Sequence, residues 1–155
     1  MRKMSVLTVS VPFTVILLIF AQSFLVGCSD DDPVTPERVV TATVTGSLTL
    51  PNAAAGKTYY VLVDADMNGD NGSVKMSTGT CGSGTGVSYQ VVDVPVGTYF
   101  VYAAVFTVSD GSQGPQTGDY YGIYGGTMNN PPAERNVTVA SGGVSSIDVL
   151  LAIVP

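Results

Sequence analysis

The chain has 155 residues, of which twelve are acidic, six are basic and none is histidine or tryptophan. Arg2 and Lys3 precede Cys28, so the chain from Cys28 onward carries four basic and twelve acidic residues, a net charge of −8. A surface of this sign repels phosphate backbones and disfavours nucleic acid as a partner. The absence of histidine excludes Ser-His-Asp and Cys-His catalytic arrangements and most zinc sites, so we expect no enzyme activity.

Residues 1–27 have the layout of a secretory signal peptide. A positively charged start is followed by apolar residues, densest over residues 15–20, and then by the small residue Gly27. A transmembrane helix needs about 20 consecutive apolar residues. The uninterrupted run here is shorter, and Pro12 breaks it. We therefore expect a cleaved signal rather than a retained membrane-spanning anchor.

The segment Leu25-Val26-Gly27-Cys28 ends this signal. It resembles the lipobox of bacterial lipoproteins, in which the signal is removed just before the cysteine. The resemblance implies that the Cys28 sulfur carries diacylglycerol and that its new amino group is acylated. Each buried CH₂ group contributes about 0.8 kcal/mol, so three acyl chains would anchor the protein durably in a membrane.

Residues 28–38 are expected to comprise the lipidated cysteine and an acidic tether. Prolines and acids without an apolar cluster favour an extended, solvated linker. Ser29-Asp30-Asp31-Asp32 also resembles the export signal of Bacteroidetes surface lipoproteins; the alternative is a spacer that keeps the domain off anionic head groups. We expect a lipid-anchored protein of the bacterial cell envelope, at the outer membrane and, with such an export signal, at the cell surface.

Residues 39–155 show the pattern of short strands separated by turn residues. Over residues 39–50, apolar side chains including Val44 and Leu48 alternate with threonine and serine. Further strands are predicted at residues 57–66, 73–77, 87–94, 98–108, 136–139 and 146–154, with a short edge strand at 120–126 and a glycine-rich loop at 78–86. Residues 98–108 are apolar on both faces, which predicts a central strand covered on both sides. The predicted fold is all-β, a seven- to eight-stranded antiparallel β-sandwich.

The segment Val92-Asp93-Val94-Pro95-Val96-Gly97-Thr98-Tyr99 joins two of these strands. It resembles the turn of the carboxypeptidase-regulatory-like, transthyretin-like (prealbumin-like) β-sandwich group. Pro95 and Gly97 would form the turn, and Tyr99 would return to the core. Domains of that group are typically accessory modules, so the resemblance implies a non-catalytic role.

Asp64-Ala65-Asp66-Met67-Asn68-Gly69-Asp70 matches the first six positions of an EF-hand calcium loop. Lys75 stands where the bidentate glutamate belongs, so an EF-hand is not expected. A strand-loop calcium site with Asp64, Asp66, Asn68 and Asp70 as ligands is the remaining metal hypothesis, and no other cofactor is expected. The alternative is a turn rich in residues that tolerate turn dihedral angles.

Tyr120, Tyr121 and Tyr124 lie among glycines and form a candidate ligand-binding set. Their rings could stack on sugars, or they could be edge-strand tyrosines that cover one end of the core. The expected function is that of a membrane-anchored, non-catalytic binding or structural module with a carbohydrate or an envelope protein as partner. Two alternatives stay open: a carbohydrate- or calcium-dependent ligand module of a surface uptake or adhesion system, and a small hydrolase. The hydrolase would need a pocket that joins aspartates, such as the pair Asp64 and Asp66, to a serine or threonine.

We expect Cys28→Ser to abolish membrane association, because serine offers no thiol to the lipid donor. The measurement is fractionation together with mass spectrometry of the mature N-terminal peptide. Cys81→Ser, the matched change at the other cysteine, should leave the lipid mass in place. An unmodified Cys28 thiol, or an intact leader in the mature wild-type protein, would contradict the assignment.

Overall fold

The structure is a computed structural model that describes residues 38–67 and 74–155. The predicted signal peptide, Cys28 and the tether up to residue 37 lie outside the described residues. The described residues belong to one unit, which begins at Arg38 and contains strands and loops but no helix among the residues described. None of the described segments is therefore a helix of membrane-spanning length and hydropathy.

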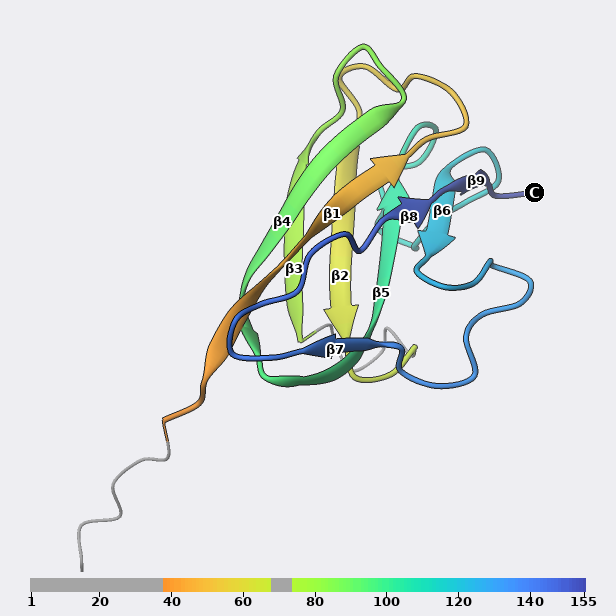
Figure 1. The fold of residues 1–155 in the computed structure, drawn as a ribbon. Coiled ribbons are helices and arrows are strands. Elements are labelled where there is room, and N and C mark those ends of the chain that lie inside the picture. The colour runs from red at the N-terminus through yellow and green to blue at the C-terminus, as the bar shows by residue number, and fades with distance from the viewer. Residues whose placement is uncertain (1–37, 68–73) are drawn as a thin grey trace, which may run out of the picture. The chain divides into compact units, whose positions relative to one another are not determined.

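A three-stranded sheet forms one layer, in the order β4-β1-β8 (Figure 1). Strands β1 (Thr41–Thr49) and β4 (Gly86–Pro95) run antiparallel, whereas β8 (Val149–Leu150) runs parallel to β1. Alternation along β1 turns Val44 and Leu48 inward, where neither is exposed to solvent. The opposite face of β1 carries the threonine and serine side chains that the sequence pattern predicts.

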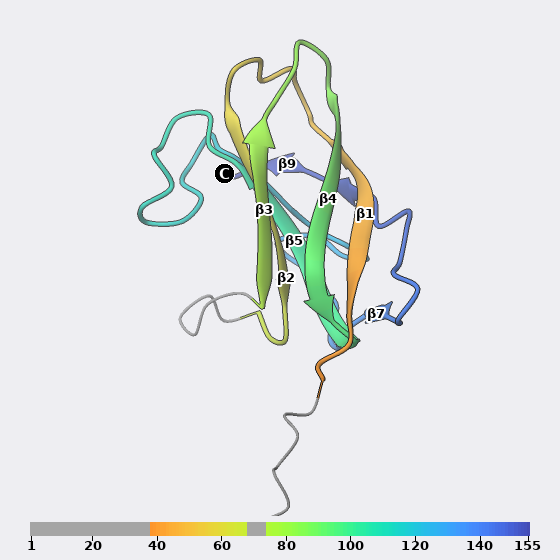
Figure 2. The same cartoon turned by 90° about the vertical axis from the view of Figure 1, so that its left-hand side faces the viewer.

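A larger sheet forms the second layer, in the order β3-β2-β5-β6-β9. Its strands are β2 (Thr58–Asp64), β3 (Lys75–Thr80), β5 (Gly97–Val105), β6 (Tyr120–Ile123) and β9 (Ala152–Ile153), and β7 (Val137–Val139) pairs with the start of β5. Figure 2 shows the two layers from the side, with β3 and β2 in one and β4 and β1 in the other.

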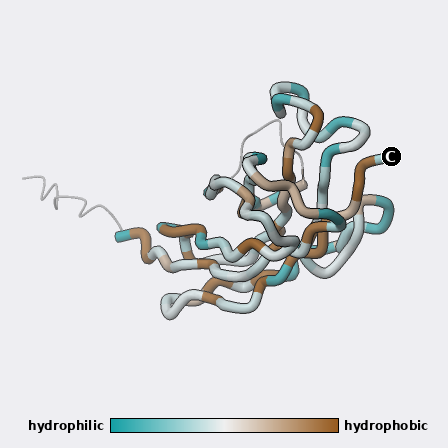
Figure 3. Tube along the Cα trace, turned by 90° about the horizontal axis from the view of Figure 1, so that it is seen from above, coloured by the Kyte–Doolittle hydropathy of each residue, from teal (hydrophilic) through white to brown (hydrophobic). Residues whose placement is uncertain are grey.

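The core lies between the two sheets and is built from the inward residues of both. It consists mainly of valines, such as Val61, Val63, Val101 and Val105 from the larger sheet and Val91 and Val94 from β4. In Figure 3 the hydrophobic stretches follow the strands, and the hydrophilic stretches lie mainly in the loops. The prediction of an all-β sandwich is confirmed.

Three predicted elements differ from the structure. The single strand predicted at 146–154 is two short strands, β8 (Val149–Leu150) in the smaller sheet and β9 (Ala152–Ile153) in the larger one. The third strand begins at Lys75 and continues to Thr80, through part of the predicted loop 78–86, because Thr78 and Thr80 pair with residues of β2. The predicted edge strand at 120–126 is not at an edge: β6 is four residues long and lies between β5 and β9. The partner of β3 is the preceding strand β2, whereas β6 lies between the preceding strand β5 and the later strand β9. The pairing within the sheet, rather than the residues of each segment alone, therefore sets the bounds and places of these strands.

The turn between β4 and β5 forms as predicted. Tyr99 is buried, and its hydroxyl donates to the Pro95 carbonyl at 2.9 Å. Just before this turn, β4 contains an extra residue relative to β1, and Asp93 adopts φ 56°. This is a β-bulge, and aspartate is among the few residues that tolerate the left-handed region.

The C-terminal segment runs alongside β1 and comes closest to it at Gly46. A Cβ atom on Gly46 would overlap the Ile147 carbonyl, so glycine is required for this close approach. The same carbonyl accepts a hydrogen bond from the Tyr89 hydroxyl at 2.6 Å. One residue further, the Asp148 carboxylate accepts hydrogen bonds from the backbone NH and hydroxyl of Ser47 at 2.8 and 2.7 Å. These contacts fix the C-terminal segment beside β1.

We expect Gly46→Ala to lower the free energy of unfolding by about 1–3 kcal/mol, because the added methyl group must displace Ile147. Chemical denaturation followed by circular dichroism measures the change. Gly86→Ala is the matched control, since a Cβ there has no neighbour within 4 Å. Equal stability of the two variants would show that the close contact between residue 46 and Ile147 does not need a glycine.

Candidate ligand-binding site

The outer face of the larger sheet is aromatic and apolar. In β2, Val61 and Val63 point into the core, so Tyr60 and Leu62 lie on the opposite face. Strand register aligns the outward residues in two rows: Met76, Leu62, Tyr102 and Ile123 form one, and Thr78, Tyr60, Ala104 and Tyr121 form the other. The sheet thus has a second apolar face, on the side away from the core.

Two adjoining hollows lie on this face. One, of about 490 Å³, is lined by Tyr60, Leu62, Met76, Tyr102, Phe106 and the loop at residues 110–115. The other, of about 320 Å³, lies beside β6 and is lined by residues that include Ile123 and Met128. Because Pro115 and Tyr121 line both, we treat the two hollows as one site and call it the aromatic groove. Its size is typical of small-molecule sites.

One wall of the groove is the loop between β5 and β6, which projects from the larger sheet on the side away from β1 and β4 (Figure 2). Asp119, which is fully buried, holds this loop. Its carboxylate accepts hydrogen bonds from the backbone NH groups of Thr107, Val108 and Ser109 at 2.8, 2.8 and 3.2 Å. The Ser109 hydroxyl and the backbone NH of Gln116 donate to its second oxygen. The Asp119 side chain alone therefore holds several backbone groups of the loop that forms this wall.

These hydrogen bonds decide the charge of Asp119. Burial raises the pKa of its carboxyl group, but the hydrogen bonds from Ser109, Val108 and Gln116 together lower it more, so the pKa lies well below its usual range. The group is thus ionised at neutral pH. Its negative charge is balanced by N–H and O–H donors, which indicates a structural role.

A second buried carboxylate, Asp64, lies under the groove. Only 1% of Asp64 is exposed, and it accepts hydrogen bonds from the Tyr102 hydroxyl at 2.9 Å and from the backbone NH of Asp66 at 3.4 Å. Burial, followed by the hydrogen bond to Asp64, raises the pKa of the Tyr102 hydroxyl. The phenol is therefore a proton donor to Asp64, and its ring is held in place at the floor of the groove.

The predicted calcium ligands are only partly described. Asn68 and Asp70 lie outside the described residues, whereas Asp64 is bonded to Tyr102 and Asp66 is partly exposed. Over residues 38–67 and 74–155, no group of three or more His, Cys, Asp or Glu side chains could hold a metal ion. Calcium binding by this loop stays a prediction.

The three predicted tyrosines do not share one face. Tyr120 is 8% exposed and belongs to the core, Tyr121 lines the aromatic groove, and Tyr124 packs against the edge of the core. Neighbouring residues of a strand point to opposite faces, which separates Tyr120 from Tyr121. Only Tyr121 therefore offers its ring to a ligand in the groove, and its neighbour there is Tyr102, with ring centroids 6.3 Å apart.

Sequence reasoning missed most of the groove, although it contained a signal. The apolar pattern on both faces of residues 98–108 was interpreted as a strand covered on both sides. In the structure Tyr102 and Phe106 are only half-buried, because the loop after β5 covers the face incompletely. The signal was the second apolar face of residues 98–108, for which the sequence predicts no element that would cover it.

Comparison with protein families, curated proteins and solved structures found no match to this chain. The three resemblances, to the lipobox, the export signal and the transthyretin-like turn, therefore rest on the residues quoted above. The chemistry of the groove must be inferred from its own side chains.

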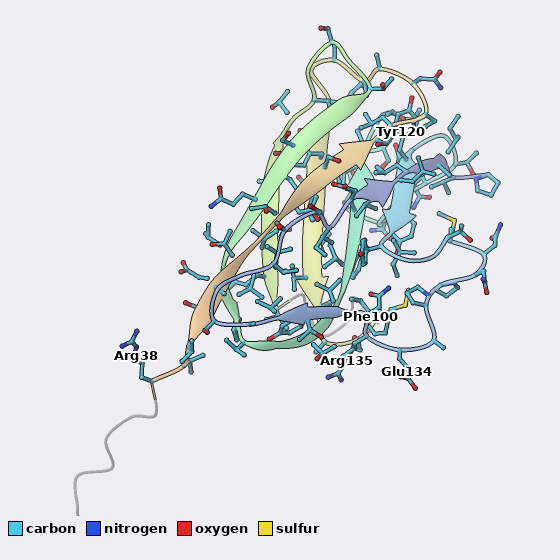
Figure 4. All side chains as sticks on the ribbon, in the orientation of Figure 1. Arg38, Phe100, Tyr120, Glu134 and Arg135 are labelled. Carbon is cyan, nitrogen blue, oxygen red and sulfur yellow. The ribbon has the colours of Figure 1, made fainter. Side chains whose placement is uncertain are left out.

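A separate hollow of about 440 Å³ lies at the end of the larger sheet away from Tyr120. It is lined by Phe100, Glu134 and Arg135 together with Asp66 (Figure 4). This hollow therefore combines acidic and basic side chains with the single ring of Phe100. The aromatic groove, in contrast, combines several rings with a single charged residue among its described lining, Asp110.

We expect Asp119→Asn to destabilise the protein by about 2–3 kcal/mol at pH 7, since an amide oxygen replaces a charged acceptor of several N–H donors. The folded-state pKa of Asp119 is lowered, so its stabilisation is full above about pH 4 and is lost as the pH falls towards that pKa. The stability difference between wild type and Asp119→Asn should therefore narrow below about pH 4, measured by denaturation at several pH values.

Asp110→Asn is the matched control, because Asp110 is exposed and lies in the same loop. It should change stability little. A difference between wild type and Asp119→Asn that stays constant from neutral to acid pH would contradict the role of the ionised carboxylate.

Proposed function

We propose that this protein is a lipid-anchored lipoprotein of the bacterial cell envelope whose β-sandwich is a non-catalytic binding module. Cys28 provides the anchor, the acidic tether separates the domain from the membrane, and the aromatic groove receives the ligand. The location at the outer membrane, and exposure at the cell surface, belong to the same proposal. They rest on the lipobox residues and on the acids at 30–32.

The contrast between the two outer faces carries the binding proposal. The three-stranded sheet exposes hydroxyl and amide side chains, such as Ser88, Gln90 and Thr49. The six-stranded sheet instead presents the rings and the Met76 side chain, which is 53% exposed. Val92 and Leu150 are also exposed on the three-stranded sheet, but the concave aromatic surface lies on the larger one. A concave apolar surface is typical of a binding site.

The buried reactive groups support a non-catalytic role. Asp64 and Asp119 are bonded to a phenol and to backbone NH groups, which gives each a structural task. Cys81 is buried, and burial raises the pKa of its thiol, so the reactive thiolate form is disfavoured. The small-hydrolase alternative would need a carboxylate that is open to a substrate; Asp64 and Asp119 are buried, whereas Asp66 and Asp110 are not.

The transthyretin-like resemblance belongs to the proposal as a family hypothesis. The bonded turn from Pro95 to Gly97 and the buried Tyr99 support it. A purely structural module is the competing function. A purely structural role does not account for the aromatic groove, and we therefore favour a binding role.

A charge placed in the groove should abolish binding. We expect Met76→Arg to lose the binding of the purified full-length protein to detergent-insoluble envelope material, because an arginine there puts a cation over an apolar surface. Co-sedimentation measures the bound fraction, and the detergent prevents the lipid anchor from contributing.

Ser88→Arg is the matched control, since it introduces the same side chain on an exposed position of β4, the edge strand of the other sheet. It should bind as the wild type does. Equal sedimentation of both variants, or no sedimentation of the wild type, would contradict the proposed binding role.

A further inference from the structure

The rings in the groove are arranged so that they leave faces open. Tyr60 and Phe106 meet edge to face, with centroids 5.3 Å apart and planes at 65°. Tyr102 and Tyr121 are tilted by 41° at 6.3 Å. Neither pair is stacked in parallel, so ring surface remains for a third flat apolar group.

Phe106 is held in this arrangement by the loop that follows it. Gly111 adopts φ 80° and packs so closely on the Phe106 ring that a Cβ atom would overlap it. Asp119 bonds the backbone on both sides of this contact, at Ser109 and at Gln116. A wall that is ordered before binding reduces the entropy that a ligand must overcome.

The polar groups at the groove accept hydrogen bonds and carry little charge. Asp110, at the rim, is exposed and accepts hydrogen bonds from Ser112, one of them from the backbone NH at 2.9 Å. A carboxylate has several acceptor positions, so it can also accept from a ligand hydroxyl. The Tyr102 hydroxyl donates to Asp64, so its oxygen can accept from a ligand hydroxyl. No lysine or arginine is among the described residues that line the groove, so an anionic ligand has no charge partner.

We propose that the ligand of the aromatic groove is a neutral glycan. A pyranose ring has an apolar face of C–H groups for the aromatic rings and an equatorial rim of hydroxyls that donate to Asp110 and to phenol oxygens. The adjoining hollows, of about 490 and 320 Å³, give an open, elongated site suited to several linked rings. This inference rests on the proposed function, whose ligand class it names.

The test is calorimetric titration of the full-length protein in detergent with three neutral probes: cellohexaose, xylohexaose and maltohexaose. We expect at least one of them to bind with a Kd below about 1 mM. Tyr121→Ala should weaken this binding at least about tenfold, and Tyr121→Phe, which keeps the ring, should retain it. Because the chain has eight tyrosines and no tryptophan, quenching of tyrosine emission is an independent readout.

Thermal unfolding of each variant shows whether the loss of binding follows from loss of folding, and Ser88→Arg is the binding control. No binding of any probe, or binding that Tyr121→Ala leaves unchanged, would overturn the glycan assignment. The binding role itself would still stand if Met76→Arg abolished co-sedimentation with envelope material. The envelope material can be treated with periodate, which oxidises glycans, or with protease before the assay. Co-sedimentation that persists after periodate but is lost after protease would identify a protein ligand and exclude the glycan.

Discussion

One buried carboxylate joins the parts of this domain that form the aromatic groove. The Asp119 side chain holds the loop that forms a wall of the groove, and its backbone carbonyl accepts a hydrogen bond from Val154 at 2.8 Å. The groove wall and the C-terminal strand are therefore fixed at the same residue. Since β6 begins at the next position, the placement of Tyr121 depends on it as well. A neutral side chain at 119 would loosen the wall, whereas the bond from Val154 would remain, because it goes to the backbone carbonyl.

The two faces of the larger sheet have different physical tasks. Valines on the inner face fill the sandwich, whereas Tyr60, Tyr102 and Tyr121 on the outer face combine an apolar ring with a polar tip. Such side chains tolerate partial exposure, because the hydroxyl can be solvated or bonded while the ring stays covered. Asp64 uses this property by anchoring one of the hydroxyls from below. The resulting surface is apolar enough to exclude water and polar enough to orient a ligand.

The sequence determined the inner half of the sandwich more clearly than the outer half. Alternation predicted the inward residues Val44 and Leu48, and the Pro95–Gly97 turn with Tyr99 followed from local turn chemistry. The position of β6 between two strands did not follow, because one of its partners, β9, lies much further along the chain than the preceding strand β5. The groove likewise depends on the loop folding back onto Asp119 through hydrogen bonds that no local pattern encodes. Side chains alternate between the two faces of a strand, but this alternation assigns Tyr120 and Tyr121 to their faces only once the bounds of β6 are known.

The parallel pairing of β1 with β8 joins the first strand of the domain to almost the last, across about a hundred residues. Contacts of such long separation form late, since the intervening chain must be available before the ends can meet. A partly synthesised domain lacks the C-terminal segment with β8, so the edge of β1 that pairs with it is free. For a chain exported as we propose, this topology delays completion of the fold until residues 149–150 have been translocated, which suits passage through a channel that accepts only unfolded polypeptide.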